Sequence, residues 1–193
     1  LFTMEETVTL NAANARIFGS DADAIHLAPI GTTLPTTIDE ALNAAFEDVG
    51  WLHSDGVTET PTGSKEVLRG HQGNGVVRTR VSEPGTTVSF VALEDKEQTR
   101  ELRYNVKSAT TPSYGVRKET RGAGQKVSPR ACVIDFFDAD DTTIKERWIV
   151  ERLEIVADGE RVYVNSDISG FPFLGEIIGD YDVLANGAFV IES

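Results

Sequence analysis

Alternation of apolar and polar residues is the main pattern in the middle of the chain. Residues 76–82 (VVRTRVS) and 86–94 (TTVSFVALE) both alternate with a period of two and are rich in β-branched side chains. Such a period places successive side chains on opposite faces of a strand. The intervening Glu83, Pro84 and Gly85 are turn-forming residues, so the pattern predicts a β-hairpin that turns at these three positions.

Further strand-like runs precede and follow this hairpin. The strongest are residues 130–138 and 144–156, which are rich in Val, Ile and aromatic side chains and flank the turn-forming sequence ADDTT. Altogether the pattern predicts seven or more strands. The remaining candidates are 25–29, a strand near Val57, 114–118, 160–165, 168–180 and 187–193.

Two short segments have helical spacing instead. Between Thr37 and Gly50 apolar residues recur every three or four positions, with Thr37 as a suitable N-cap and Gly50 just beyond the end. Residues 94–105 also have helical spacing, because their charged side chains recur at intervals of three and four. The sequence therefore predicts two short amphipathic helices. The positions that carry the two patterns are Ile38, Leu42, Ala45 and Phe46 in the first, and Glu97, Arg100, Glu101 and Arg103 in the second.

Strands and helices do not alternate regularly, so a parallel sheet is not expected. The predicted fold class is mainly β (α+β): an antiparallel β-sandwich or barrel with one or two short flanking helices. Residues 1–24 are small and polar without a sustained period, and we expect them to form an N-terminal arm. Residues 25–193 are expected to form one domain, with extended loops near 58–75 and 105–130.

Length and composition agree with one folded domain. The chain has 193 residues, of which 40% are hydrophobic, enough to bury a core without disulfides. No apolar run approaches the roughly 18 residues of a membrane span, and the first residues lack the basic and apolar parts of a signal peptide. The single cysteine, Cys132, excludes an internal disulfide and favours a reducing compartment.

The net charge of −13 is unevenly distributed. Residues 1–64 carry a formal charge of −9, residues 65–130 carry +6 and residues 131–193 carry −10. Opposed charge blocks suit head-to-tail contact between copies, although interspersed surface charge would also account for them. The overall acidity argues against conventional nucleic-acid binding, which needs a basic surface.

Candidate metal sites are weak. His26, His53 and His71 lie far apart in the sequence and have no partner cysteine, so no zinc site is expected. The sequence from Asp138 begins like a calcium loop, but Thr143 stands where that loop needs glycine and Ile149 stands where it needs a carboxylate. An acidic hairpin turn is the simpler interpretation.

No catalytic or cofactor motif is complete either. The Gly-rich stretches 71–77 and 121–126 match neither phosphate-binding pattern and are interpreted as flexible loops. Cys132 lies within an apolar strand pattern, which suits a core residue rather than a nucleophile. We therefore expect no catalytic residue, no metal and no cofactor.

The order of short patterns along the chain resembles the major tail proteins of siphophages that infect actinobacteria. Loop 70–75, the hairpin that ends in SFVALED, the helix 96–105 and the late strand within 168–181 follow in the same order, so the resemblance covers roughly residues 25–182. Segment 105–130 departs from it, being longer and more basic than that family leads us to expect. The resemblance begins with the run 28–57, which precedes these segments. The residues that carry it there are Ala28, Pro29, Gly31, Thr32, Leu34, Pro35, Gly50, Trp51, Asp55, Gly56 and Val57.

This resemblance implies a structural virion protein with a tail-tube fold. Six copies would close into a ring, and the rings would stack into a tube through which genomic DNA is ejected without sequence-specific binding. Tape-measure, tail-tip and tail-terminator proteins are the expected further partners. The expected location is the phage tail, after assembly in the host cytoplasm, and the protein would be neither an enzyme nor anchored in a membrane.

A DNA conduit needs an inner face that does not bind phosphate, and the acidic third block is the best source of it. The candidates for the lumen are Glu146, Glu151 and Glu154, since the run 145–156 carries charge on both faces. The alternative is that these acids lie on the outer surface in cross-strand ion pairs with Arg147 and Arg152.

Other functions remain open at this stage. A tail terminator, a head decoration protein and the tube protein of a type VI secretion system would all suit a β-sandwich with arms. A carbohydrate-binding sandwich would need aromatic residues on an exposed face, whereas the chain is only 8% aromatic and Trp51 and Trp148 are far apart in the sequence. An enzyme would need a site that the sequence does not reveal.

Overall fold

The computed structural model describes residues 10, 12–111 and 115–187 of the chain. Within these residues the protein is mainly antiparallel β-sheet, as the sequence predicts, with one α-helix and a short 3-10 helix, η1 (Ala12–Asn14). The helix α1 spans Glu97–Arg103. The strands are β1 (Ala24–Ala28), β2 (Glu47–Asp48), β3 (Leu52–Arg69), β4 (Val76–Ala92), β5 (Val106–Thr110), β6 (Lys118–Arg121), β7 (Ser128–Phe137), β8 (Lys145–Ala157), β9 (Phe171–Ile177) and β10 (Asp182–Ala185).

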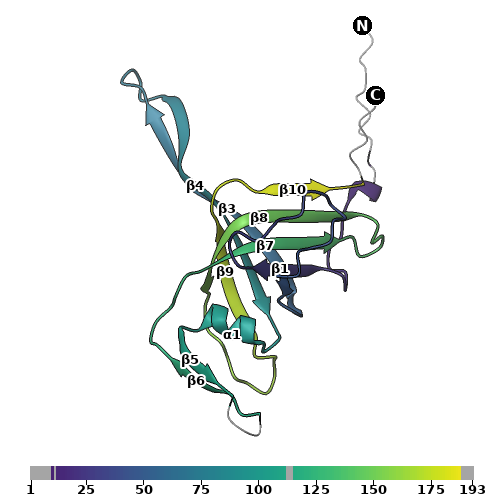
Figure 1. Cartoon of the computed structure of the whole chain (residues 1–193). Coiled ribbons are helices and arrows are strands. Elements are labelled where there is room, and N and C mark those ends of the chain that lie inside the picture. Colours follow the sequence, from purple (N-terminus) through teal and green to yellow (C-terminus); the bar gives the residue numbers. More distant parts are fainter. Residues whose placement is uncertain (1–9, 11, 112–114, 188–193) are drawn as a thin grey trace.

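One large sheet makes up the body of the protein. Its strands follow the order β2-β1-β7-β8-β9-β4-β3, and β10 lies beside the first half of β8 (Figure 1). The two ends of this order, β2 and β3, are neighbours in the chain. Val49 donates a backbone hydrogen bond to Ile25 on one side, and Leu93 donates one to Trp51 on the other. The sheet therefore bends round until its ends are connected, and its inner face encloses the core.

Buried apolar side chains from five strands and α1 fill this inner face. Phe171 and Phe173 are the largest fully buried ones, and the ring of Phe173 packs at a tilt against Phe90 with 5.4 Å between centroids. Leu102 of α1 is fully buried as well, so the helix closes one end of the core. The remaining core residues are Ile25, Leu27, Val49, Val88, Ala92, Cys132, Ile134, Trp148, Val150, Leu153, Ile155 and Ile177.

A bulge in β8 keeps its apolar residues on the core side. Cys132 of β7 faces Val150, but Arg130 faces Leu153, so β8 has one extra residue between these pairs. The extra residue reverses the alternation, because a strand otherwise changes face at every position. Both Val150 and Leu153 consequently point into the core.

The outer face of β7 and β8 is also buried, and the segment 35–46 covers it. Arg147 and Asp135 form an ion pair there with a distance of 2.6 Å. Arg147 also donates hydrogen bonds to the carbonyl oxygens of Thr37 and Glu40. The predicted helix from Thr37 to Gly50 is wrong: the segment is irregular apart from β2, and the hydrogen bonds from Arg147 hold it as a cover over β7 and β8.

The predicted turn at 83–85 is also wrong. β4 continues through it, and the hairpin turns at 70–75 instead, where Gly70 donates a backbone hydrogen bond to Gly75. Glu83 has a φ of 53°, and the register shifts between Thr62 and Ser64 of the facing strand. Residues 83–85 therefore form a β-bulge, a place where a strand tolerates proline.

Some of the other predicted strands and helices are present in the structure and others are not. The strands predicted at 25–29, 130–138, 144–156 and 168–180 correspond to β1, β7, β8 and β9, and the helix predicted within 94–105 is α1. No strand forms at 160–165, and β10 lies at a position that was not predicted. Residues 112–114 and 188–193, which include parts of two predicted strands, lie outside the described residues. None of the described helices is long and apolar enough to span a membrane.

Replacing Phe173 tests the core. We expect Phe173→Ala to lower the free energy of unfolding by about 3–5 kcal/mol, because it leaves a cavity beside Phe90. Phe173→Leu keeps most of the volume and should cost less than about 1.5 kcal/mol. Urea denaturation followed by circular dichroism measures both values. Equal, small losses in the two variants would show that this ring is not part of a tightly packed core.

Candidate functional site

The most exposed element of the body is the outer half of the β3–β4 hairpin. We call residues 63–85 the arm. β9 pairs with β4 only along Thr86–Ala92, so the arm is a ribbon of two strands with no third strand beside it in the part of the chain that the structure describes. It projects away from the sheet as the long hairpin at the upper left of Figure 1. The segment 58–75, which the sequence predicts as an extended loop, is thus largely a strand of this hairpin.

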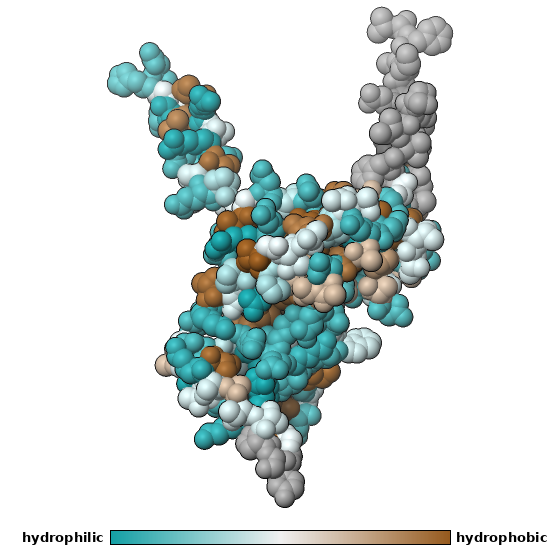
Figure 2. All heavy atoms as spheres, viewed as in Figure 1, coloured by the Kyte–Doolittle hydropathy of each residue, from teal (hydrophilic) through white to brown (hydrophobic). Residues whose placement is uncertain are grey.

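The arm combines exposed apolar residues with basic ones. Figure 2 shows hydrophobic and hydrophilic residues intermixed along it. The outer part, residues 67–81, contains Arg69, Arg78 and Arg80 and no acidic residue. Nearer the body, Arg80 pairs with Glu66 across the two strands. The exposed apolar side chains are Val67, Leu68, Val76, Val77 and Val81.

A large pocket lies at the other end of β3. We call it the hollow; its volume is about 1120 Å³. It is lined by residues 18–24, by residues 50–57 and by parts of β7 and β8 that include Phe136 and Trp148. Trp51 is part of this lining although its side chain is 72% exposed. A large apolar side chain is thus available for contact beside the opening.

The hollow is acidic. Six carboxylates and two histidines line it, and the lining contains neither lysine nor arginine. Lys96, from outside the lining, pairs with two of these carboxylates at 3.0 and 3.3 Å. Burial lowers the pKa of His26, which keeps this imidazole neutral at pH 7. The carboxylates belong to Asp21, Asp23, Asp48, Asp55, Glu94 and Glu146.

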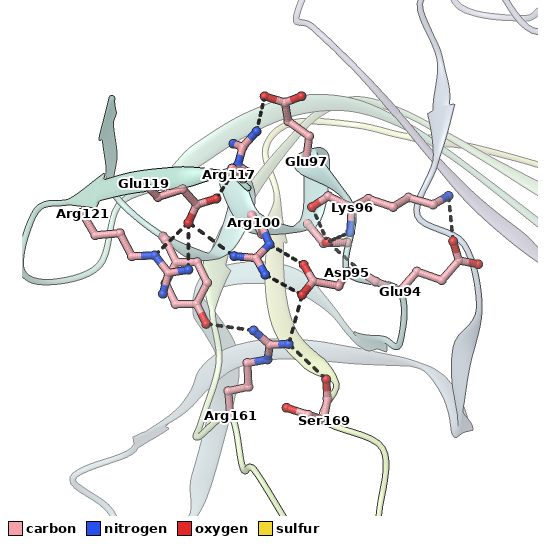
Figure 3. Close-up of polar contacts among 12 residues, drawn as sticks. Glu94, Asp95, Lys96, Glu97, Arg100, Arg117, Glu119, Arg121, Arg161 and Ser169 are labelled. Atoms are coloured by element: carbon pink, nitrogen blue, oxygen red, sulfur yellow. Dashed lines mark hydrogen bonds and ion pairs between the residues drawn. The ribbon is translucent and has the colours of Figure 1, made fainter. Parts of the chain in front are cut away.

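A second polar cluster attaches the β5–β6 hairpin to α1 and the end of the sheet (Figure 3). Glu119 of β6 is at its centre, with a side chain only 5% exposed. It accepts hydrogen bonds from Arg117, Arg121 and, at 3.5 Å, Arg100 of α1. Burial alone would raise the pKa of Glu119, but these hydrogen bonds and the charges of Arg100 and Arg121 outweigh it and hold the pKa below 4.5.

Arg161 extends the cluster to the last part of the chain. It donates hydrogen bonds to the Tyr104 hydroxyl and to the backbone oxygen of Ser169, and its guanidinium lies 3.7 Å from the centre of the Phe171 ring. The segment 105–130, predicted as a basic loop, therefore contains a hairpin, and two of its three arginines, Arg117 and Arg121, form ion pairs. This role could not be read from the sequence, because the cluster also draws on Glu97 and Arg100 of α1 and on Arg161.

The three glutamates proposed for a lumen occupy different positions on β8. The indole nitrogen of Trp148 donates a hydrogen bond of 2.5 Å to Glu146, which lines the hollow. Glu154 pairs with Arg152 at 2.6 Å, but this pair lies along β8 and not across two strands as the alternative supposed. Glu151 lies in the exposed bulge. Arg147 pairs with Asp135 rather than with these glutamates.

The residues considered for chemistry are not brought together. Among the described residues, no three or more His, Cys, Asp or Glu side chains are grouped so that they could hold a metal ion. Burial raises the pKa of the Cys132 thiol, which disfavours the reactive thiolate. Asp138 accepts hydrogen bonds from the backbone nitrogens of Asp140 and Asp141, so it stabilises the β7–β8 turn.

Comparison with protein families identifies a match. The family model described as phage tail tube protein matches residues 8–182, which include the arm, the hollow and the Glu119 cluster. No curated protein matches the chain.

The Glu119 cluster predicts how stability depends on pH. Because the folded-state pKa of Glu119 lies below its ordinary value, its stabilisation is complete above about pH 4.5 and is lost as the pH falls through the folded-state pKa. We expect Glu119→Gln to unfold more easily at neutral pH and to lose less stability on acidification than the unmodified chain. Denaturation at a series of pH values measures this. Glu101→Gln, on the exposed side of α1, is the matched control, and parallel curves for both variants would contradict the prediction.

Proposed function

Because the chain belongs to the phage tail tube protein family, we propose that it is the major tail protein of a siphophage and that six copies form each ring of a stacked tube. Membership of this family makes the protein a structural component of the phage tail that associates with itself into a tube. The ring number, the siphophage and an actinobacterial host are the finer parts of the proposal. They are supported by the patterns around Pro29, Trp51 and Val57 described above.

The observation that carries self-assembly is the arm. A lone hairpin of two strands is marginally stable in water, and this one also exposes five apolar side chains. A ribbon of this kind is accounted for if neighbouring copies cover it. A different segment, residues 1–24, is proposed to form an N-terminal arm attached to the domain 25–193. This N-terminal arm would add further contacts between subunits or rings.

A role in DNA ejection is supported by charge. Six copies at −13 give a ring with a formal charge of −78, and the inward part of that charge would keep phosphate from adhering. Double-stranded DNA would thus pass through without sequence-specific binding. We further propose tape-measure, tail-tip and tail-terminator proteins as partners, and assembly in the host cytoplasm.

Electron microscopy of the purified protein tests the assembly. We expect negatively stained samples at high concentration to contain rings or tubes. A variant that lacks residues 1–15 keeps the contacts of Ile17 and Phe18 with the β7–β8 turn, so it should stay folded by circular dichroism but assemble poorly. A full-length chain that stays monomeric at all salt and protein concentrations would refute self-assembly. Unchanged tubes from the shortened chain would refute only the role of its first residues.

The lumen assignment has its own test. Replacing Glu151 and Glu154 together by lysine should slow or block DNA ejection from assembled tails, because each new cation gains phosphate contacts that repeat around the ring. Glu146 is left unchanged in this variant, because its carboxylate lines the hollow and accepts a hydrogen bond from Trp148. The control replaces two exposed acids outside the hollow, Asp158 and Glu160, by lysine and changes the net charge equally. Ejection at normal speed from tails of the first variant, or equal slowing by both, would show that these glutamates do not line the conduit.

A further inference from the structure

The arm needs a surface to cover it, and its composition indicates what kind. Its five exposed apolar side chains need an apolar contact, and two bases in its outer part, Arg69 and Arg78, form no ion pair within the described residues, whereas Arg80 pairs with Glu66. Arg78 stands opposite Leu68 on the ribbon, so basic and apolar side chains are presented together. A complementary surface must therefore be acidic and must also offer an apolar side chain.

The hollow has both properties. Six carboxylates line it, and Trp51 exposes most of its indole there. Its volume of about 1120 Å³ lies above the range of about 300–1,000 Å³ that small-molecule sites span, so it is large enough for a piece of polypeptide. Arginine also interacts favourably with the face of a tryptophan ring.

The arm of a copy does not reach the hollow of the same copy. β3 contributes Leu52 and the residues up to Val57 to the hollow, whereas its other end, residues 64–69, belongs to the arm. At about 3.3 Å per residue these six positions extend about 20 Å further from the body. The arm points away from the sheet along this direction (Figure 1). Its partner must be another molecule.

We propose that the arm of one copy lies in the hollow of a neighbouring copy, with its arginines facing the carboxylates and its valines packing against Trp51. This inference rests on the self-assembly proposed above and adds the two surfaces that meet. Each copy both gives an arm and receives one, so the contact is head-to-tail and can repeat from copy to copy. Repetition of such a contact produces a closed ring or a continuing stack.

Charge reversal tests this pairing. Arg78→Glu in the arm and Asp55→Lys in the hollow should each raise the protein concentration needed for assembly by about tenfold or more, because like charges then face each other. Both substitutions in one chain should restore assembly to within about threefold of the unmodified protein. Light scattering and negative-stain microscopy measure the effect. Lys118→Glu and Asp140→Lys make the same charge changes at exposed positions outside both surfaces and serve as controls.

Disulfide trapping tests proximity directly. Gln72→Cys places a thiol at the tip of the arm, and Ser54→Cys places one in the lining of the hollow. The native Cys132 is fully buried and does not compete. Mixing the two variants under mild oxidation should give a crosslinked dimer that reductant separates. Gln72→Cys mixed with Asp140→Cys is the matched control and should give none.

The outcomes separate the two proposals. If the unmodified chain does not assemble, both the proposed function and this inference are wrong. If it assembles but the double charge reversal gives no rescue, or the two cysteine mixtures crosslink equally, only the pairing of arm and hollow is refuted. Rescue together with selective crosslinking supports it.

Discussion

The structure depends on β8, which connects otherwise separate parts of the sheet. It pairs with β7 along nearly all of its length, with β10 at residues 146–149 and with β9 at residues 153–157. Its apolar residues change from even positions (Trp148, Val150) to odd ones (Leu153, Ile155), so both halves face the core only because the bulge beside Glu151 shifts the alternation by one residue. Without it, Leu153 and Ile155 would face outwards and the inner face between β8 and β9 would lose its apolar surface.

A buried ion pair organises the opposite side of this strand. Arg147 and Asp135 are nearly inaccessible to solvent, and Nη1 of the arginine donates to two carbonyl oxygens of the segment that covers it. Burying two charges is costly unless each group is fully hydrogen-bonded. The interaction therefore fixes the path of the covering segment more than it adds stability. That path leads directly into β2 and from there to the rim of the hollow.

The sequence predicts those elements whose pattern is decided locally. The apolar runs of β7 and β8 were sufficient to predict these strands, and the spacing of charged residues was sufficient to predict α1. In each case the neighbouring elements stabilise the same structure that the local pattern favours. The segment after Thr37 has equally good helical spacing, but it packs over β7 and β8 in an irregular path held by hydrogen bonds from the distant Arg147, a contact that no local pattern reveals. Pro84 and Gly85 are typical of turns and also of bulges, so their sequence did not distinguish the two. The hollow could not be predicted, since it brings together residues from Phe18 to Trp148.

The length of β3 also has a mechanical consequence. The same strand runs from the hollow to the end of the arm and is paired with β4 along most of this distance. A pull on the arm along its axis would be carried by both strands of the hairpin and would reach the sheet where β4 pairs with β9 along Thr86–Ala92, so the hydrogen bonds of that pairing would be loaded together, in shear, instead of opening one after another. Ribbons loaded in this way resist extension well, whereas the bulge at Glu83 still permits bending. An assembly joined through such arms would resist stretching but would bend easily.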